Sequence, residues 1–231
     1  MQKIVTPERL FFIFSILYVL TVSWLNFPVT TILKPVPIFC LMMIAGRAFL
    51  PMRPKRLLLL ALLFSLLGDV ALTIPLKIQL ELGLTFFLIA HLSYIVLFSI
   101  GIRSIRTRRR ISLVLMNIYI LILFFVGSFF YILMPHLGDM LIPVVLYMVI
   151  ITCMVFCAMV LNPVTAMGAA LFLISDSILA FNEFIDKDFN GTVWIMLSYY
   201  LAQWFIVMGT IHFFQRESFP ETAVNNGINN P

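Results

Sequence analysis

The chain has 231 residues, of which 62% are hydrophobic and 11% are charged, with a mean hydropathy of +1.09 and a formal net charge of +5. A soluble domain of this length has too little interior to bury so much apolar surface, so the composition excludes that class. Apolar runs of about 18 residues or more recur, and each is long enough to cross a hydrocarbon core about 30 Å thick. We therefore expect an all-α, polytopic integral membrane protein.

Eight membrane spans are predicted in chain order. They are expected at residues 10–27, 31–49, 56–74, 78–102, 111–134, 139–161, 164–184 and 191–214. Because all but one of the connections between them are short, residues 1–214 are expected to form a single eight-helix transmembrane domain. Residues 215–231 are rich in asparagine and are expected to be a disordered cytoplasmic tail.

Lysine and arginine predict the orientation, because they are enriched in cytoplasmic loops. With a cytoplasmic N-terminus, 12 of the 15 basic residues fall on the cytoplasmic side: Lys3, Arg9, Arg47, Arg53, Lys55, Arg56, Arg103, Arg106, Arg108, Arg109, Arg110 and Arg216. Both termini are therefore expected in the cytoplasm. The arginine cluster at 103–110 lies between two spans, so we interpret it as a topology determinant that contacts anionic headgroups, and no nucleic acid partner is expected.

Two aspartates lie inside predicted spans, Asp69 in "SLLGDVALT" and Asp176 in "FLISDSILA". Each stands 13 residues from the cytoplasmic start of its span, which corresponds to about 20 Å of helix. A carboxylate at this depth is costly in free energy and is a functional-site candidate by default. The two aspartates are thus expected to share a depth and a function.

Further polar side chains occur at a similar depth or nearer the outer surface, and we expect them to line one cavity with the aspartates. They are Lys34, His91, Tyr94, Asn182, Glu183, Tyr199, Tyr200 and Gln203. The motifs "LLGDVAL" and "LISDSIL" are also similar and lie 107 residues apart. This spacing fits a parallel repeat of four helices plus four helices, with the aspartates facing each other across a pseudo-two-fold axis.

Two nearby carboxylates in a cavity of low dielectric do not both ionise readily, so one supplies a general acid and the other an anion. This division of labour suits reactions that pass through an oxocarbenium ion. A three-histidine zinc site is not expected, because only His91 is well placed, and no G-x-S-x-G elbow is present. The sequence therefore predicts no metal and no cofactor.

Five motifs in order, "LKPVPIF", "LLGDVALT", "FLIAHLSYI", "GAALFLISDSILAFNEF" and "YYLAQWFIV", extend from about Lys34 to Gly209. Together they resemble the lysoplasmalogenase family of YhhN-like membrane proteins. The resemblance implies an eight-helix enzyme that hydrolyses the vinyl ether bond of lysoplasmalogens. Its products would be a fatty aldehyde and glycerophosphoethanolamine or glycerophosphocholine, and its partners a lysophospholipid substrate and membrane lipids.

Site roles follow from this resemblance as hypotheses. Asp176 is assigned as the acid and Asp69 as the base, although the sequence does not separate the two roles. Lys34 is expected to face the substrate phosphate. The other residues of the polar set are expected to bind the substrate and to position the vinyl ether and water.

An alternative from another class is a proton-coupled transporter or lipid flippase that uses the same carboxylates as a relay. It is less favoured because Pro35, Pro37 and Pro143 do not flank the aspartates in sequence. A purely structural membrane protein is disfavoured by the convergent polar set. We expect a multi-pass protein of a cell (inner) membrane, with the endoplasmic reticulum as the alternative, and the oligomeric state is left open.

Overall fold

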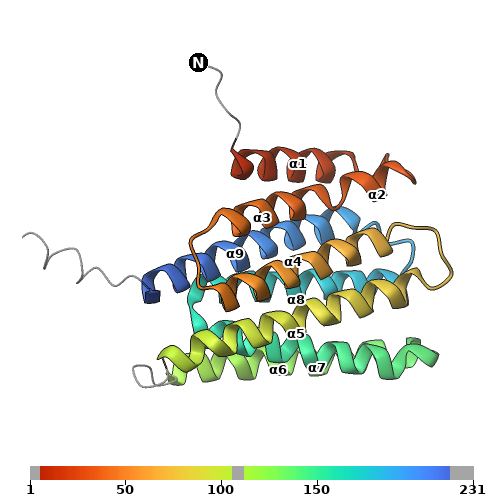
Figure 1. Cartoon of the computed structure of the whole chain (residues 1–231). Coiled ribbons are helices and arrows are strands. Elements are labelled where there is room, and N and C mark those ends of the chain that lie inside the picture. Colours follow the sequence, from red (N-terminus) through yellow and green to blue (C-terminus); the bar gives the residue numbers. More distant parts are fainter. Residues whose placement is uncertain (1–5, 106–111, 219–231) are drawn as a thin grey trace, which may run out of the picture.

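The computed structural model describes residues 6–105 and 112–218, and within these residues every regular element is helical. The helices are α1 (Pro7–Thr21), α2 (Val29–Leu33), α3 (Val36–Arg47), α4 (Met52–Ala71), α5 (Gln79–Ile105), α6 (Leu113–Leu133), α7 (Leu141–Leu161), α8 (Pro163–Phe184) and α9 (Thr192–Ser218). Two short 3-10 turns, Met134–His136 and Gly138–Met140, connect α6 to α7. Figure 1 shows the long helices running side by side.

Within the described residues, six helical segments are long and apolar enough to cross a membrane. They are Val29–Arg47, Gln79–Ile105, Leu113–His136, Gly138–Leu161, Pro163–Phe184 and Thr192–Ser218. The prediction of an all-α, polytopic membrane protein is therefore confirmed. The other two long helices are α1, which has 15 residues, and α4, which carries three basic residues near its start. The count of eight spans stays a prediction.

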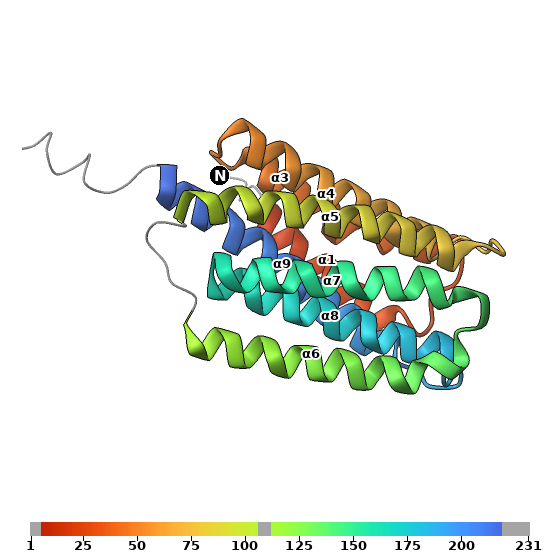
Figure 2. The same cartoon turned by 90° about the horizontal axis from the view of Figure 1, so that it is seen from below.

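Six helices pack in a closed ring in the order α3, α4, α5, α7, α8 and α9, with α9 returning to α3. Helix α1 lies outside the ring against α3 and α9, and α6 lies outside it against α7 and α8. Figure 2 shows α6 along one edge of the bundle. The side chains that point into the ring therefore come from helices that are distant in sequence.

The second half of the chain repeats the helix contacts of the first half. The contacts α1–α3, α3–α4 and α4–α5 recur as α6–α7, α7–α8 and α8–α9, and the contact of α5 with α7 recurs as that of α9 with α3. The two aspartates occupy the corresponding helices α4 and α8. This arrangement follows the four-plus-four repeat expected from the two aspartate motifs.

The start of α1 and the end of α9 lie at the same end of the bundle, which is also where α5 ends and α6 begins (Figure 1). An even number of membrane crossings places both ends of the chain on the same side of the membrane. That this side is the cytoplasm stays a prediction. The expected tail is partly wrong, because α9 continues through residues 215–218. Arg216 lies in its last turn, where a positive charge favours the helix dipole. The rest of the tail, Lys3 and the arginines at 106–110 lie outside the described residues.

Close packing of α8 on α9 depends on two glycines. A Cβ atom on Gly168 would lie 2.7 Å from the backbone oxygen of Ala202, and one on Gly209 would lie 2.8 Å from the backbone nitrogen of Thr165. Asn162 begins α8 by accepting a hydrogen bond from the Thr165 backbone, and it donates another to the Gly209 carbonyl. Small residues at such contacts let membrane helices approach closely, which positions the Asp176 face of α8.

Candidate functional site

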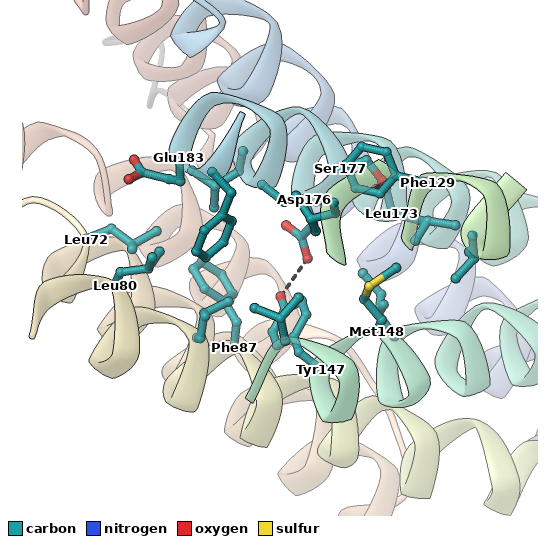
Figure 3. Close-up of a pocket in the computed structure, with 18 residues that line it drawn as sticks. Leu72, Leu80, Phe87, Phe129, Tyr147, Met148, Leu173, Asp176, Ser177 and Glu183 are labelled. Atoms are coloured by element: carbon teal, nitrogen blue, oxygen red, sulfur yellow. Dashed lines mark hydrogen bonds between the residues drawn. The ribbon is translucent and has the colours of Figure 1, made fainter. Parts of the chain in front are cut away.

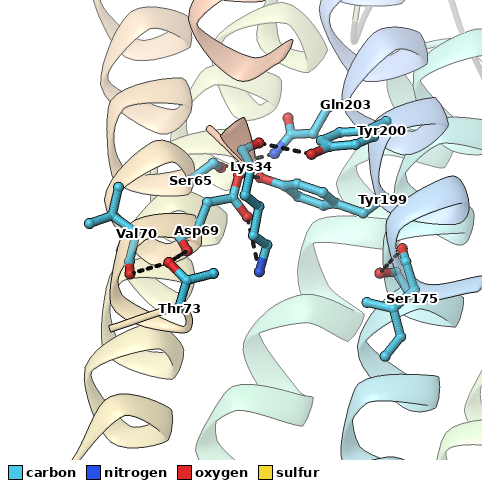
Figure 4. Close-up of polar contacts among 10 residues, drawn as sticks. Lys34, Ser65, Asp69, Val70, Thr73, Ser175, Tyr199, Tyr200 and Gln203 are labelled. Carbon is cyan, nitrogen blue, oxygen red and sulfur yellow. Dashed lines mark hydrogen bonds and ion pairs between the residues drawn. The ribbon is translucent and has the colours of Figure 1, made fainter. Parts of the chain in front are cut away.

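The predicted polar residues form two separate networks. The first surrounds Asp69, which is 1% exposed on α4. The Tyr199 hydroxyl donates to its Oδ2 at 2.9 Å, and Nζ of Lys34 lies 3.6 Å from its Oδ1 (Figure 4). Because a buried charge needs a partner, this ion pair explains how Asp69 is held in an apolar bundle.

Three more polar contacts extend the first network across the ring, and a fourth is local to the end of α4. The Tyr200 hydroxyl donates to the backbone oxygen of Lys34 at 2.8 Å, where the break between α2 and α3 begins. Gln203 donates to Ser65 at 3.0 Å and accepts from the Tyr94 hydroxyl at 2.7 Å. Thr73 donates to the Asp69 carbonyl. The network thus joins the break between α2 and α3 to α4, α5 and α9 through side-chain hydrogen bonds and one ion pair.

The second network surrounds Asp176 on α8, whose side chain is 16% exposed. The Tyr147 hydroxyl donates to its Oδ2 at 2.6 Å, and Nε2 of His91 lies 2.9 Å from the same hydroxyl. The imidazole itself is completely buried and its Nε2 lies 3.6 Å from Asp176. When Asp176 is ionised, the single hydroxyl proton of Tyr147 goes to the carboxylate, so Nε2 of His91 donates to the tyrosine oxygen.

A narrow cavity opens beside Asp176 (Figure 3), and about 50 Å³ of it is accessible to the centre of a water-sized sphere. Four polar side chains line it: Tyr147, Asp176, Ser177 and Glu183. The remaining wall is apolar and is formed by Leu72, Leu80, Leu84, Phe87, Val126, Phe129, Leu133, Val144, Met148, Ile151, Leu173, Leu179, Ala180 and Phe184. An apolar cavity with a few placed polar groups is typical of a small-molecule site.

Aromatic rings separate the two aspartates. The Phe172 ring lies 4.7 Å from the His91 ring and 5.4 Å from the Tyr199 ring, and Phe87 packs against both Phe172 and Tyr199. Asp69 does not belong to the described residues that line the cavity beside Asp176. The expectation of one shared cavity is therefore wrong. Asp69 and Asp176 have the predicted matching position along their helices, but the Phe87 and Phe172 rings lie between them.

The remaining predicted residues lie either at the cavity beside Asp176, in the Asp69 network, or in neither. Glu183 lines the cavity near the end of α8, seven residues after Asp176 and therefore on the same face of the helix. Lys34, Tyr94, Tyr199, Tyr200 and Gln203 belong to the Asp69 network. Asn182 does not line the cavity, and its buried Oδ1 has no hydrogen-bond partner among the described residues.

Tyr147 is a residue of this site that was not predicted from the sequence. A usable signal exists, because Tyr147 interrupts the apolar run "VVLYMVI" six residues from the start of α7. Asp176 stands eight residues before the end of the antiparallel helix α8, so the two share a depth from the same end. Across residues 6–105 and 112–218, no group of three or more His, Cys, Asp and Glu side chains is placed to hold a metal ion.

The fold and the site define a class: a helical, polytopic membrane protein with a partly buried carboxylate at an apolar cavity. The model of the YhhN family matches residues 29–210, which is most of the chain. The chain therefore belongs to the YhhN family, as the resemblance of its five motifs predicted.

Two curated relatives illustrate the similarity. The protein named Lysoplasmalogenase in Mycobacterium bovis is 34% identical over 182 residues, which cover 74% of this chain and 65% of the relative. The human protein named Lysoplasmalogenase TMEM86B is 28% identical over 196 residues, which cover 83% of this chain and 77% of the relative. The match thus spans somewhat less than two thirds of the mycobacterial protein. No solved structure matches this chain.

Proposed function

We propose that this protein hydrolyses the vinyl ether bond of lysoplasmalogens, releasing a fatty aldehyde and glycerophosphoethanolamine or glycerophosphocholine. The observation that carries the proposal is Asp176, held by Tyr147 at the wall of an apolar cavity within the bundle. The names of the relatives support the substrate class. A cavity of this character suits a single-chain amphiphile that arrives laterally from the bilayer.

The chemistry requires one proton donor that can also accept. The protonated Asp176 transfers its proton to the β-carbon of the vinyl ether, which gives an oxocarbenium ion beside the new carboxylate. The carboxylate stabilises the cation and takes a proton from the attacking water, forming a hemiacetal. Asp176 then protonates the departing glycerol oxygen as the C–O bond breaks, and the hemiacetal hydroxyl transfers its proton to the Asp176 carboxylate, which forms the aldehyde. The reaction consumes one water, yields aldehyde and alcohol, and leaves Asp176 protonated again.

Tyr147 and His91 support this cycle as positioning residues. The 2.6 Å hydrogen bond from Tyr147 holds the carboxyl group of Asp176 in place at the cavity wall. His91 holds the tyrosine hydroxyl from the other side at 2.9 Å. Because His91 is completely buried, its position is set by packing and does not depend on the substrate.

We assign Asp69 a different role from the base expected from the sequence. Its carboxylate is bonded by Tyr199 and paired with Lys34, and it is screened from the cavity by Phe87 and Phe172. Asp69 and Lys34 therefore act as a buried pair that holds α4 against the break between α2 and α3. In this arrangement Lys34 neutralises Asp69 instead of facing the substrate phosphate.

Glu183 is assigned to the cationic headgroup. It lines the same cavity as Asp176 and lies seven residues further along α8, a rise of about 10 Å. The ammonium group of an ethanolamine or choline headgroup is separated from the vinyl ether by a glycerol and a phosphate. A carboxylate at this distance from the acid is suited to pair with that charge.

The test measures aldehyde release by the protein purified in mild detergent. A lysoplasmalogen is the substrate, and lysophospholipids with an acyl or a saturated ether chain are the controls. Asp176→Asn should lower turnover by at least about 100-fold, the smallest contribution usual for a general acid. Asp188→Asn, the same change in the exposed loop after α8, should leave turnover unchanged. Full activity in Asp176→Asn would overturn the assignment.

The second candidate is the transporter or flippase, and one observation favours it. The break between α2 and α3 places Lys34 against Asp69, so an interrupted helix does meet an intramembrane carboxylate, which the sequence alone did not suggest. Aldehyde release by the wild type decides for the hydrolase. If a folded wild type releases none, lipid flux in proteoliposomes that is lost in Asp69→Asn would decide for transport.

A further inference from the structure

We propose that the groove between α6 and α7 binds the hydrocarbon chain of the substrate and sets which chain lengths are accepted. This chain groove is lined by Tyr119, Leu123, Val126, Gly127, Phe130, Val145, Met148, Val149, Thr152 and Cys153. The inference rests on the proposed function for the identity of the ligand, a single-chain lipid. It goes beyond that function by assigning a second site, on the lipid-facing side of the bundle.

Continuity with the cavity beside Asp176 carries the inference. Val126 and Met148 line both the cavity and the chain groove, so the two spaces adjoin at these side chains of α6 and α7. From this junction the groove extends along α6 to Tyr119, seven residues away, which corresponds to about 10 Å. The groove therefore begins at the wall of the reaction cavity and leads away from it.

The polarity of the combined space matches an amphiphile. In Figure 3, Glu183 lies toward one end of the residues drawn, Phe129 and Met148 lie toward the other, and Asp176 lies between them. The groove continues from the Met148 end with almost entirely apolar walls. A lipid with its headgroup at Glu183 and its vinyl ether at Asp176 would direct its chain into the groove.

Loose packing of α6 gives a chain room to enter. Leu133 is the single buried residue of α6, whose whole length the structure describes. Lipid tails are as apolar as the groove, so binding gains little from removing apolar surface from water. Selectivity must instead come from the shape of the groove and from van der Waals contact with its walls. A side chain added to the groove should therefore exclude long chains by simple obstruction.

Gly127 offers a site for such an obstruction. A Cβ atom at Gly127 would have no heavy atom within 4 Å, so a side chain added there begins in open space. Gly46 on α3 is equally open and exposed, and it does not line the chain groove. Gly127→Phe and Gly46→Phe thus add the same ring to a helix, one inside the groove and one outside it.

The experiment compares lysoplasmalogens that carry a decenyl or an octadecenyl chain and have the same headgroup. The ratio of kcat/KM for the long chain to that for the short chain is measured in detergent for each protein. Gly127→Phe should lower this ratio about tenfold, the low end of what shape discrimination in an apolar pocket supplies. Gly46→Phe should keep the wild-type ratio. A ratio unchanged by Gly127→Phe would overturn the inference.

Two additions keep the result decisive. Val149→Phe adds a ring from the opposite wall on α7, and its ratio is read if Gly127→Phe does not fold. Binding of a saturated octadecyl ether lysophospholipid, which has no vinyl ether to hydrolyse, is measured in parallel. Weaker binding by Gly127→Phe supports the groove even if no protein releases aldehyde, which would refute the proposed function alone. Equal binding by Gly127→Phe and wild type would refute the groove.

Discussion

Tyr147 and Asp176 are 29 residues apart in the sequence, and the tyrosine hydroxyl donates a hydrogen bond of 2.6 Å to Oδ2 of the aspartate. Short hydrogen bonds to a carboxylate are among the stronger polar interactions in proteins. This bond joins α7 to α8 at the wall of the cavity and leaves the carboxyl group partly exposed to it. The proposed acid is therefore oriented by a neighbouring helix, and its supports can be tested separately from the acid itself.

Removing the Tyr147 hydroxyl should affect catalysis more than folding. Tyr147→Phe keeps the ring packed beside His91 and removes only the bonds to Asp176 and His91. A hydrogen bond to a charged group contributes about 1.5–3 kcal/mol, so kcat should fall by about tenfold or more while KM changes little. Steady-state aldehyde release measures both constants. The control is Tyr131→Phe, because Tyr131 is 80% exposed on α6, and an unchanged kcat in Tyr147→Phe would contradict the positioning role.

Breaking the Asp69–Lys34 pair should destabilise the protein. Lys34→Met leaves a buried carboxylate without its counter-ion, which should cost about 3–5 kcal/mol in the free energy of unfolding. The double variant Lys34→Met with Asp69→Asn should lose less than the sum of the single variants, because it removes both charges. Thermal unfolding in mild detergent reports this comparison.

The same variants separate the two roles considered for Asp69. If Asp69 is a structural partner of Lys34, the double variant should recover aldehyde release together with its stability. If Asp69→Asn is as stable as the wild type but inactive, the result would support the catalytic base predicted from the sequence.

Glu183 should decide the preference for a cationic headgroup. Glu183→Gln keeps the size of the side chain and removes its charge, so KM for an ethanolamine lysoplasmalogen should rise about tenfold, equivalent to about 1.4 kcal/mol. An alkenyl glycerophosphate has no amine and should be processed equally by the wild type and the variant. A parallel loss with both substrates would show that Glu183 does not recognise the amine.

The predicted orientation can be tested by labelling single cysteines in intact cells. In a background without Cys40, Cys153 and Cys157, a cysteine in place of Asp188 should react with a membrane-impermeant maleimide added outside. A cysteine in place of Arg53, at the opposite end of the bundle, should react only after the cells are opened. The reverse pattern would invert the predicted topology.

The sequence alone determined the membrane class, the helices and the depth of their polar residues. The predicted span 164–184 differs from α8 by one residue, because Asn162 and Pro163 are typical of a helix start and the apolar run marks its length. Depth follows from residue number, since each helical residue adds about 1.5 Å of rise. The five motifs also predicted the YhhN family, which the family match confirmed.

Tertiary structure decided which of these residues meet. The sequence predicted one cavity for Asp69 and Asp176, whereas packing placed the Phe87 and Phe172 rings between the two networks. It also joined Asp176 to Tyr147, a residue that no motif marked. The physical reason is that residue numbers set the height of a side chain along its helix. The rotation of each helix and the choice of its neighbours depend on how all the helices pack together in the ring.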